Sequence, residues 1–490
     1  MIRRAFVRVS AEHLFSVLLF GAVLAMAAGR GSTCWFVCLP GLLGGGVVFL
    51  AMCHGRGEAL LAWSLVAFSV LVQCLLGDSP GPLLLGVALG GGGLLGRLMR
   101  FGMRRTITRH LYSGRCMACM AGAAMAVVYS ILYLNGGLWL RVGSFSVQLS
   151  ETVKPLLAVF VAGVQTSALQ VRQRYLALFG CGLMNVALLA GLSELGTAAV
   201  VWLAVVIVLL YYYPWQFGFF TLLVSVGAAF GGGAVALFVA EKNLPLPALL
   251  KRLVDKVSSR VTLFLHPDQA DPLGAGYQQA KAVQALLTGG SLGTLQPEAV
   301  PVASSDYILV GVVAAMGTLF ALLVIGLLWL LYQLFFKVGE SLKNPAVQAF
   351  ALTGWAVLVV SSLLPAAGSL GLCPVMGIAV PFLASGGTAL LVSCWLLVVP
   401  LAEAGSVAAV YKGRRYPVSK GVYDGKNAVD FDRCGGSADL SVGGVPESAD
   451  MANTVPTSRS GDSPASDRSA GVRSGDSGRP GGNRCGRKPQ

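Results

Sequence analysis

Residues 306–336 read DYILVGVVAAMGTLFALLVIGLLWLLYQLFF, and after Asp306 this run contains no charged side chain. An apolar α-helix of about 20 residues is long enough to cross the hydrocarbon core of a bilayer. Similar runs recur along the chain, at residues 12–28, 34–53, 59–77, 81–96, 116–134, 152–170, 177–192, 196–213, 215–240, 347–372 and 376–401. The chain is therefore predicted to be an all-α, polytopic integral membrane protein with about twelve transmembrane helices.

The composition excludes several other classes of protein. Only 12% of the 490 residues are charged, against about 25% in a soluble globular protein. The formal net charge of +14 belongs to clusters at the ends of apolar runs, where Lys and Arg set topology, so we expect no nucleic acid partner. Cys116 and Cys119 form a CxxC inside an apolar run without His or carboxylate neighbours, and we interpret them as small buried residues.

Basic loops predict the orientation of the chain in the membrane. Residues 97–115 contain six arginines and no acidic residue, and such loops are retained in the cytoplasm. Counting spans outward from this loop places both termini in the cytoplasm. Residues 135–150 and the long segment 241–305 then face outward.

The chain divides into three predicted regions. Residues 1–96 form divergent N-terminal transmembrane helices, which contain no motif that we can assign. Residues 97–401 form the membrane core. The outward loop 241–305 of this core contains an amphipathic stretch that is expected to lie along the membrane surface. Residues 402–490 form a cytoplasmic tail, which turns to Gly, Ser, Asp, Arg and Pro and is predicted to be disordered from about residue 430.

Few ionisable residues lie at the outer ends of the predicted spans, and such residues suggest function because they are costly in a membrane. Glu151 and Lys154 are three residues apart, on one helical face. Glu194 and Asp306 come out on the same side of the membrane. A shared polar cavity that opens outward is one expectation. Charges that simply contact lipid headgroups are the alternative.

Five stretches of the core resemble, in order, the motifs of the SEDS family (shape, elongation, division and sporulation; the FtsW/RodA/SpoVE group). Residues 135–154, NGGLWLRVGSFSVQLSETVK, are similar to its signature NGxxRW(I/L)xLGxxxxQPSExxK. SELGT at 193–197 is similar to PDLGT, and DPLGAGYQ at 271–278 is similar to DPxGxGYQ. PVASSDY at 301–307 resembles PEAHTDF, and PVMGIAVPFLASGG at 374–387 resembles LPVTGIPLPFISYGG.

This resemblance implies a ten-helix core, with two additional helices at the N-terminus, that polymerises lipid II into peptidoglycan glycan strands. Asp306 matches the essential aspartate of the family, and a carboxylate there is suited to act as general base on the acceptor 4-hydroxyl. Lys154 and Arg141 are candidates to offset the charge of the pyrophosphate. The full set of candidate substrate-binding residues is Trp139, Arg141, Glu151, Lys154, Glu194, Tyr277 and Gln278.

The resemblance also implies where the protein works and with what. We expect a bacterial cytoplasmic membrane, a class B penicillin-binding protein as transpeptidase partner, and contacts with other division or elongation proteins. A divalent cation, Mg²⁺ or Mn²⁺, is a further expectation, without assigned ligands. The Asn135-Gly136 opening and the long tail favour the division branch of the family over the elongation branch.

Several positions depart from the family pattern and keep alternatives open. Other residue types replace the family's Glu and His before the aspartate, the acidic pair after it, the signature Arg and several later polar residues. The replacing residues are, in that order, Val302, Ser304, Ala314, Ala315, Leu138, Ser361, Pro365 and Ala384. The alternatives to a polymerase are a lipid II flippase and a scaffold of cell division or elongation without catalytic activity.

Overall fold

The computed structural model describes residues 46–47, 49–50, 53, 56–76, 114–142, 145–242, 244–266, 275–294, 300 and 302–411. The predicted spans at 12–28 and 81–96, most of the span at 34–53, and the tail from residue 412 lie outside these ranges. So does most of the DPLGAGYQ stretch. The regular elements of the described residues are helices, apart from one short hairpin, so the predicted all-α fold is confirmed.

Eight helices of the described ranges are long and apolar enough to cross a bilayer. They are α3 (Gly57–Leu75), α6 (Gly114–Asn135), α8 (Val171–Gly191), α9 (Leu195–Tyr212), α10 (Trp215–Glu241), α14 (Thr318–Ser341), α15 (Pro345–Ser369) and α16 (Gly387–Tyr411). The chain is thus a multi-pass membrane protein. The helix α16 continues past residue 401, where the core was expected to end.

Two predicted spans are shorter than their apolar runs. The run at 306–336 is divided at Gly317 into α13 (Ile308–Met316) and α14. Gly317 has a φ of +90°, and a Cβ there would overlap the carbonyl oxygen of Ser291, so the break needs glycine. The run at 152–170 forms α7 (Val153–Gln165), preceded by the 3-10 turn η2 (Leu149–Thr152).

The predicted span at 376–401 is helical only from Gly387 onward. Residues 374–386 form an irregular segment instead, in which Phe382 has a φ of +64°. Pro374 and Pro381 cannot donate the backbone hydrogen bonds of a helix, which explains why hydrophobicity alone overestimates the span. The segment is nevertheless buried around Val380, Phe382 and Leu383.

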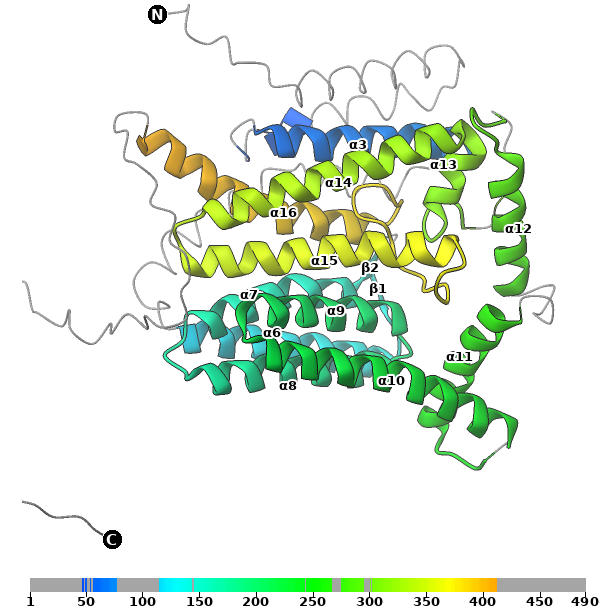
Figure 1. Cartoon of the computed structure of the whole chain (residues 1–490), viewed down its shortest axis with the longest axis horizontal. Helices are drawn as coiled ribbons and strands as arrows, with labels where there is room; N and C mark the ends of the chain where they lie inside the picture. The colour runs from blue at the N-terminus through cyan, green and yellow to red at the C-terminus, as the bar shows by residue number, and fades with distance from the viewer. Residues whose placement is uncertain are drawn as a thin grey trace, which may run out of the picture. The chain divides into compact units, whose positions relative to one another are not determined.

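Helix α15 occupies the middle of the bundle and packs against α7, α9, α14 and α16 (Figure 1). These contacts bury a continuous set of aliphatic side chains, among them Leu157, Val200, Leu331, Val357 and Leu396. Burial of this apolar surface fixes the ends of the helices relative to one another. The loops that connect them are therefore held at defined positions.

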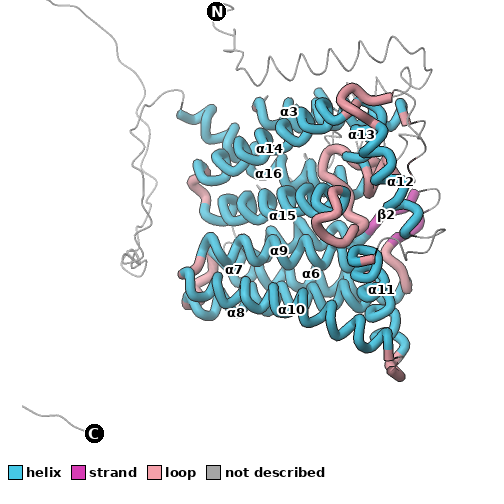
Figure 2. Tube along the Cα trace, turned by 45° about the vertical axis from the view of Figure 1, so that its right-hand side comes forward, coloured by secondary structure: helices cyan, strands magenta, loops and turns pink. Residues whose placement is uncertain are grey.

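The segments that were predicted to face outward lie at one end of the bundle (Figures 1 and 2). They comprise the hairpin of β1 (Trp139–Val142) and β2 (Phe145–Gln148), in which Trp139 pairs with Gln148, and the helices α11 (Ala248–Leu265) and α12 (Ala275–Thr288). Both helices run across the direction of the spans (Figure 1). This arrangement agrees with the expected amphipathic, non-spanning character of the 241–305 loop.

Candidate functional site

Asp306 lies in a tight turn between α12 and α13. The carbonyl oxygen of Val302 accepts hydrogen bonds from the backbone N–H of Ser305 at 3.1 Å and of Tyr307 at 3.3 Å. Ser385 N–H donates to the carbonyl oxygen of Ser304 at 2.8 Å. The turn is therefore fastened to the irregular 374–386 segment, although the two are far apart in the sequence.

The carboxylate of Asp306 is half-buried and touches this segment. A Cβ added to Gly377 would stand 2.9 Å from Asp306 Oδ2, so only glycine permits the approach. Burial raises the pKa of the Asp306 carboxyl above its ordinary value, while the hydrogen bond from Ser305 and the positive charge of Arg260 lower it. A carboxylate with a raised pKa is suited to accept a proton.

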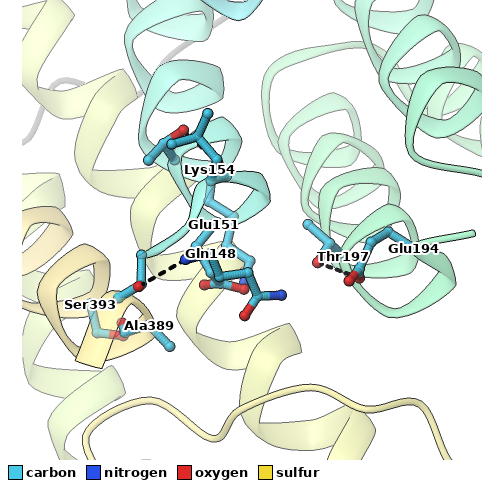
Figure 3. Close-up of polar contacts among 10 residues, drawn as sticks. Gln148, Glu151, Lys154, Glu194, Thr197, Ala389 and Ser393 are labelled. Carbon is cyan, nitrogen blue, oxygen red and sulfur yellow. Dashed lines mark hydrogen bonds and ion pairs between the residues drawn. The ribbon is translucent and has the colours of Figure 1, made fainter. Parts of the chain in front are cut away.

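Glu194 lies at the beginning of α9, next to Ser193, whose φ is +60°. The hydroxyl of Thr197 donates to Glu194 Oε2 at 3.3 Å (Figure 3). Burial raises the pKa of Glu194, and the nearby Lys256 opposes the rise. Lys256, on α11, donates to the carbonyl oxygen of Ser193, and so joins α11 to this loop.

Glu151 and Lys154 form a buried ion pair on η2 and α7. Lys154 Nζ donates to both carboxylate oxygens of Glu151, each at 2.7 Å, and the two residues are 5% and 4% exposed. Figure 3 shows this pair on the helix beside the start of α9. Both partners interact electrostatically with Glu194. The charge of Lys154 is therefore neutralised within the protein.

A cavity of about 290 Å³ lies between α11, the start of α9 and residues 374–377. Glu194, Lys256 and Arg260 supply its charged lining, and Gly377 also lines it. Arg260 donates to the carbonyl oxygen of Val375, which holds α11 against residues 374–377. Gly196 makes the closure possible, since a Cβ there would stand 2.8 Å from Ile378 Cγ1.

Of the four charged residues expected to line one cavity, only Glu194 does so. Glu194 lines the cavity, and Asp306 borders it through Gly377. Glu151 and Lys154 are buried and do not line the cavity.

The remaining candidates lie at the same end of the molecule, outside the cavity lining. Trp139 is 48% exposed on β1, and Arg141 is exposed two residues further along this strand. Tyr277, 43% exposed, and Gln278 lie in the first turn of α12.

Lys256 and Arg260 were not among the candidates from the sequence. Both belong to the amphipathic stretch that was assigned to the membrane surface. Their spacing of four residues places them on one helical face, but α11 also contains Lys251 and Arg252, and both of these are exposed. Only the packing of α11 distinguishes the pair that faces the cavity.

Three acidic, His or Cys side chains gathered around a common point would indicate a metal site, and the described ranges contain no such group. Asp306 remains available as a single carboxylate ligand. Magnesium is often held by one or two carboxylates together with substrate phosphates, so the residues fit an ion that arrives with a phosphorylated substrate.

Comparison with known proteins gives consistent matches. The model of the FtsW/RodA/SpoVE cell cycle proteins matches residues 88–403. The probable peptidoglycan glycosyltransferase FtsW of Acinetobacter baylyi is 29% identical over 268 residues, which are 52% of this chain and 62% of that protein. The peptidoglycan glycosyltransferase RodA of Mycobacterium tuberculosis is 27% identical over 308 residues, 58% of this chain and 60% of that protein. The chain thus spans less than two thirds of the length of these relatives.

One solved structure supports the fold. A chain of a peptidoglycan synthase complex, described as coordinating polymerization and crosslinking, superposes with a TM-score of 0.52 at 22% identity. The alignment covers 71% of this chain and 96% of that chain. At this level of identity the similarity concerns the fold alone.

Proposed function

Because the chain belongs to the FtsW/RodA/SpoVE family of cell cycle proteins, we propose that it polymerises lipid II into peptidoglycan glycan strands. Two relatives carry the name peptidoglycan glycosyltransferase, and the activity is transferred here as a proposal. The single observation that carries it is the position of Asp306. Its half-buried carboxylate is held against Gly377, at the edge of a cavity that is lined by two cationic side chains.

The proposed reaction is a glycosyl transfer. The 4-hydroxyl oxygen of the acceptor sugar attacks C1 of the donor sugar, and Asp306 takes the hydroxyl proton. The bond between C1 and the diphosphate oxygen breaks, and its electron pair leaves with the polyprenyl diphosphate. Burial supports the role of the base, since it raises the pKa of Asp306 towards the range where a carboxylate accepts a proton effectively.

The other candidate residues take supporting roles in this proposal. Trp139, exposed at the outer end, offers an aromatic face for a sugar or polyprenyl chain. Three further candidates lie at the same end of the molecule and are proposed to contact the carbohydrate or peptide of the substrate. They are Tyr277, Gln278 and Arg141. Glu151 and Lys154 are proposed to support the start of α9, and with it Glu194, rather than to bind substrate directly.

The setting is proposed as follows. The protein lies in the bacterial cytoplasmic membrane with both termini inside, and the α11–α12 end faces outward. A class B penicillin-binding protein is the proposed transpeptidase partner, together with other division or elongation proteins. A divalent cation, Mg²⁺ or Mn²⁺, is proposed to accompany the diphosphate and would supply additional positive charge there.

Two other functions make different predictions. A lipid II flippase would move labelled lipid II across a bilayer without forming polymer. A scaffold would bind its partners and do neither. The polar environment of Asp306 favours the enzyme, since a scaffold has no need of a half-buried carboxylate beside a charged cavity.

The test is polymerisation of lipid II by the purified full-length chain, alone and with its transpeptidase partner. We expect Asp306→Asn to reduce the rate by about 10²–10⁴-fold, the usual contribution of a general base. Asp255→Asn, an exposed acid on α11, is the matched control and should retain activity. Equal polymerisation by Asp306→Asn and wild type would refute the catalytic role. Transbilayer movement without polymer would favour the flippase.

A further inference from the structure

We propose that the cavity between α9, α11 and residues 374–377 binds the diphosphate group of the polyprenyl-linked donor, with Lys256 and Arg260 as its cationic ligands. The inference rests on the proposed glycosyl transfer and assigns one part of the substrate to one part of the site. It also moves the charge-compensating role from Lys154 and Arg141 to two residues of the amphipathic helix α11.

The hydrogen-bonding capacity of the two cations supports this assignment. Lys256 uses one N–H for the carbonyl oxygen of Ser193, and Arg260 uses one for that of Val375. An ammonium group has three donors and a guanidinium group has five. These contacts therefore orient both side chains along the cavity wall and leave further donors for a ligand with several oxygen acceptors.

The start of α9 adds a second contribution from a different element. Leu195 and Gly196, the first two residues of this helix, line the same cavity. The N-terminus of a helix presents unpaired backbone N–H groups and partial positive charge, and both favour a phosphate. Cationic side chains and a helix terminus thus converge on one space.

The charge balance of the lining is positive. Among the described residues that line the cavity, Lys256 and Arg260 oppose the single carboxylate of Glu194. Burial raises the pKa of Glu194, and the nearby Lys256 opposes this rise. Burial lowers the pKa of Lys256, while the nearby Glu194 raises it, and a bound diphosphate would favour the charged ammonium in the same way.

The volume of the cavity suits a headgroup. About 290 Å³ is close to the lower limit of ligand pockets, about 300–1,000 Å³. This space accommodates a diphosphate and its immediate neighbours, but a lipid-linked disaccharide with its peptide must extend beyond it. The wall at Gly377 touches Asp306, so a diphosphate here would lie beside the base, as the leaving group of the transfer requires.

The cations proposed from the sequence are less suitable. Lys154 is buried and donates to both oxygens of Glu151, so a phosphate would have to compete with an existing ion pair. Arg141 is exposed on β1 and does not line the cavity. The geometry therefore favours α11 over both of them.

The experiment measures binding of farnesyl diphosphate and farnesyl monophosphate to the full-length protein in detergent, by equilibrium dialysis with radiolabelled ligand. We expect the wild type to prefer the diphosphate. Lys256→Gln and Arg260→Gln should each weaken diphosphate binding about tenfold, because each removes a charge-assisted hydrogen bond. Lys251→Gln and Arg252→Gln, at exposed positions near the beginning of the same helix, should leave binding unchanged.

Unchanged diphosphate affinity in both Lys256→Gln and Arg260→Gln would overturn the inference, as would an equal loss in the two exposed controls. Arg260 also holds residue 375, so thermal unfolding of each variant is measured in parallel. If Arg260→Gln does not fold, Lys256→Gln decides the result, and Arg260→Lys tests whether charge alone maintains binding.

The same variants separate this inference from the proposed function. Polymerisation of lipid II with normal diphosphate affinity in both α11 variants would support the polymerase and reject the site. If these variants lose diphosphate affinity and the wild-type protein binds the diphosphate but forms no polymer, the site is supported and the polymerase is rejected.

Discussion

Asp306 and Gly377 are in direct contact across two loops: a Cβ at position 377 would stand 2.9 Å from Asp306 Oδ2. The contact joins the turn before α13 to the irregular segment before α16. It also connects the proposed base with the cavity, since Gly377 forms part of the wall. The position of the Asp306 carboxylate thus depends on the absence of a side chain at position 377.

We predict that Gly377→Ala reduces lipid II polymerisation by about tenfold or more, because the added methyl group displaces the carboxylate and small displacements of a catalytic group are costly. Gly386→Ala is the matched control in the same segment, since its Cβ would meet Ala389 Cβ at an ordinary 3.5 Å. Rates are compared at equal amounts of folded protein. Retention of full activity by Gly377→Ala would show that the contact is not needed.

The buried ion pair of Glu151 and Lys154 predicts a strong effect on stability. Lys154→Met should lower the free energy of unfolding by about 3–5 kcal/mol, because it leaves the Glu151 carboxylate buried without its partner. The double variant Glu151→Met/Lys154→Met should recover most of this loss. Lys251→Met, at an exposed position of α11, should change stability by less than about 0.5 kcal/mol. A double variant as unstable as Lys154→Met would contradict the explanation.

Asp306 is predicted to reduce the stability of the fold. Its pKa is raised by burial, so the folded protein holds the proton more tightly than the unfolded chain. Stability from this group is therefore present at low pH and is lost as pH rises from the ordinary pKa of 3.8 through the raised folded value. Asp306→Asn should unfold at a higher temperature than wild type at pH 7, and this difference should vanish in acid. A lower unfolding temperature at pH 7 would contradict the prediction.

The pH dependence of activity follows from the same carboxyl group. Polymerisation needs ionised Asp306, so the rate should rise with pH through the raised pKa. Arg260 lowers this pKa, and Arg260→Gln should therefore move the acidic limb of the profile to higher pH. Arg252→Gln, at an exposed position near the beginning of α11, serves as the control. An acidic limb that stays in place would exclude an electrostatic effect of Arg260 on the base.

Val302 is predicted to strain the turn that carries Asp306. Its φ of +60° is unfavourable for a β-branched residue, and its side chain is 42% exposed, so little packing depends on it. Val302→Asn should raise the free energy of unfolding by about 1 kcal/mol, because asparagine adopts this conformation more readily. Val283→Asn, at a 45% exposed helical position of α12, should give no such gain. Destabilisation by Val302→Asn would show that the valine side chain contributes packing.

Much of the fold could be predicted because transmembrane helices are encoded locally. The apolar runs around α6, α8, α9, α10 and α15 predicted helices whose bounds differ by only a few residues, except that α8 begins six residues earlier. Length and hydrophobicity suffice there, since a helix in a membrane satisfies its backbone hydrogen bonds internally. The breaks at Gly317 and before Gly387 were missed, because they depend on contacts with distant segments such as Ser291 and Ser304.

The sequence by itself determined an all-α membrane protein, its family, and Asp306, Glu194, Glu151 and Lys154 as the ionisable residues to test. These follow from local hydrophobicity and from the order of short motifs. Only the tertiary structure decided which charges face one another: Lys154 is neutralised by Glu151, while Lys256 and Arg260 line the cavity beside Asp306. The physical reason is that electrostatic interaction depends on distance and burial in space, and packing of α11 against α10 and the loops sets both.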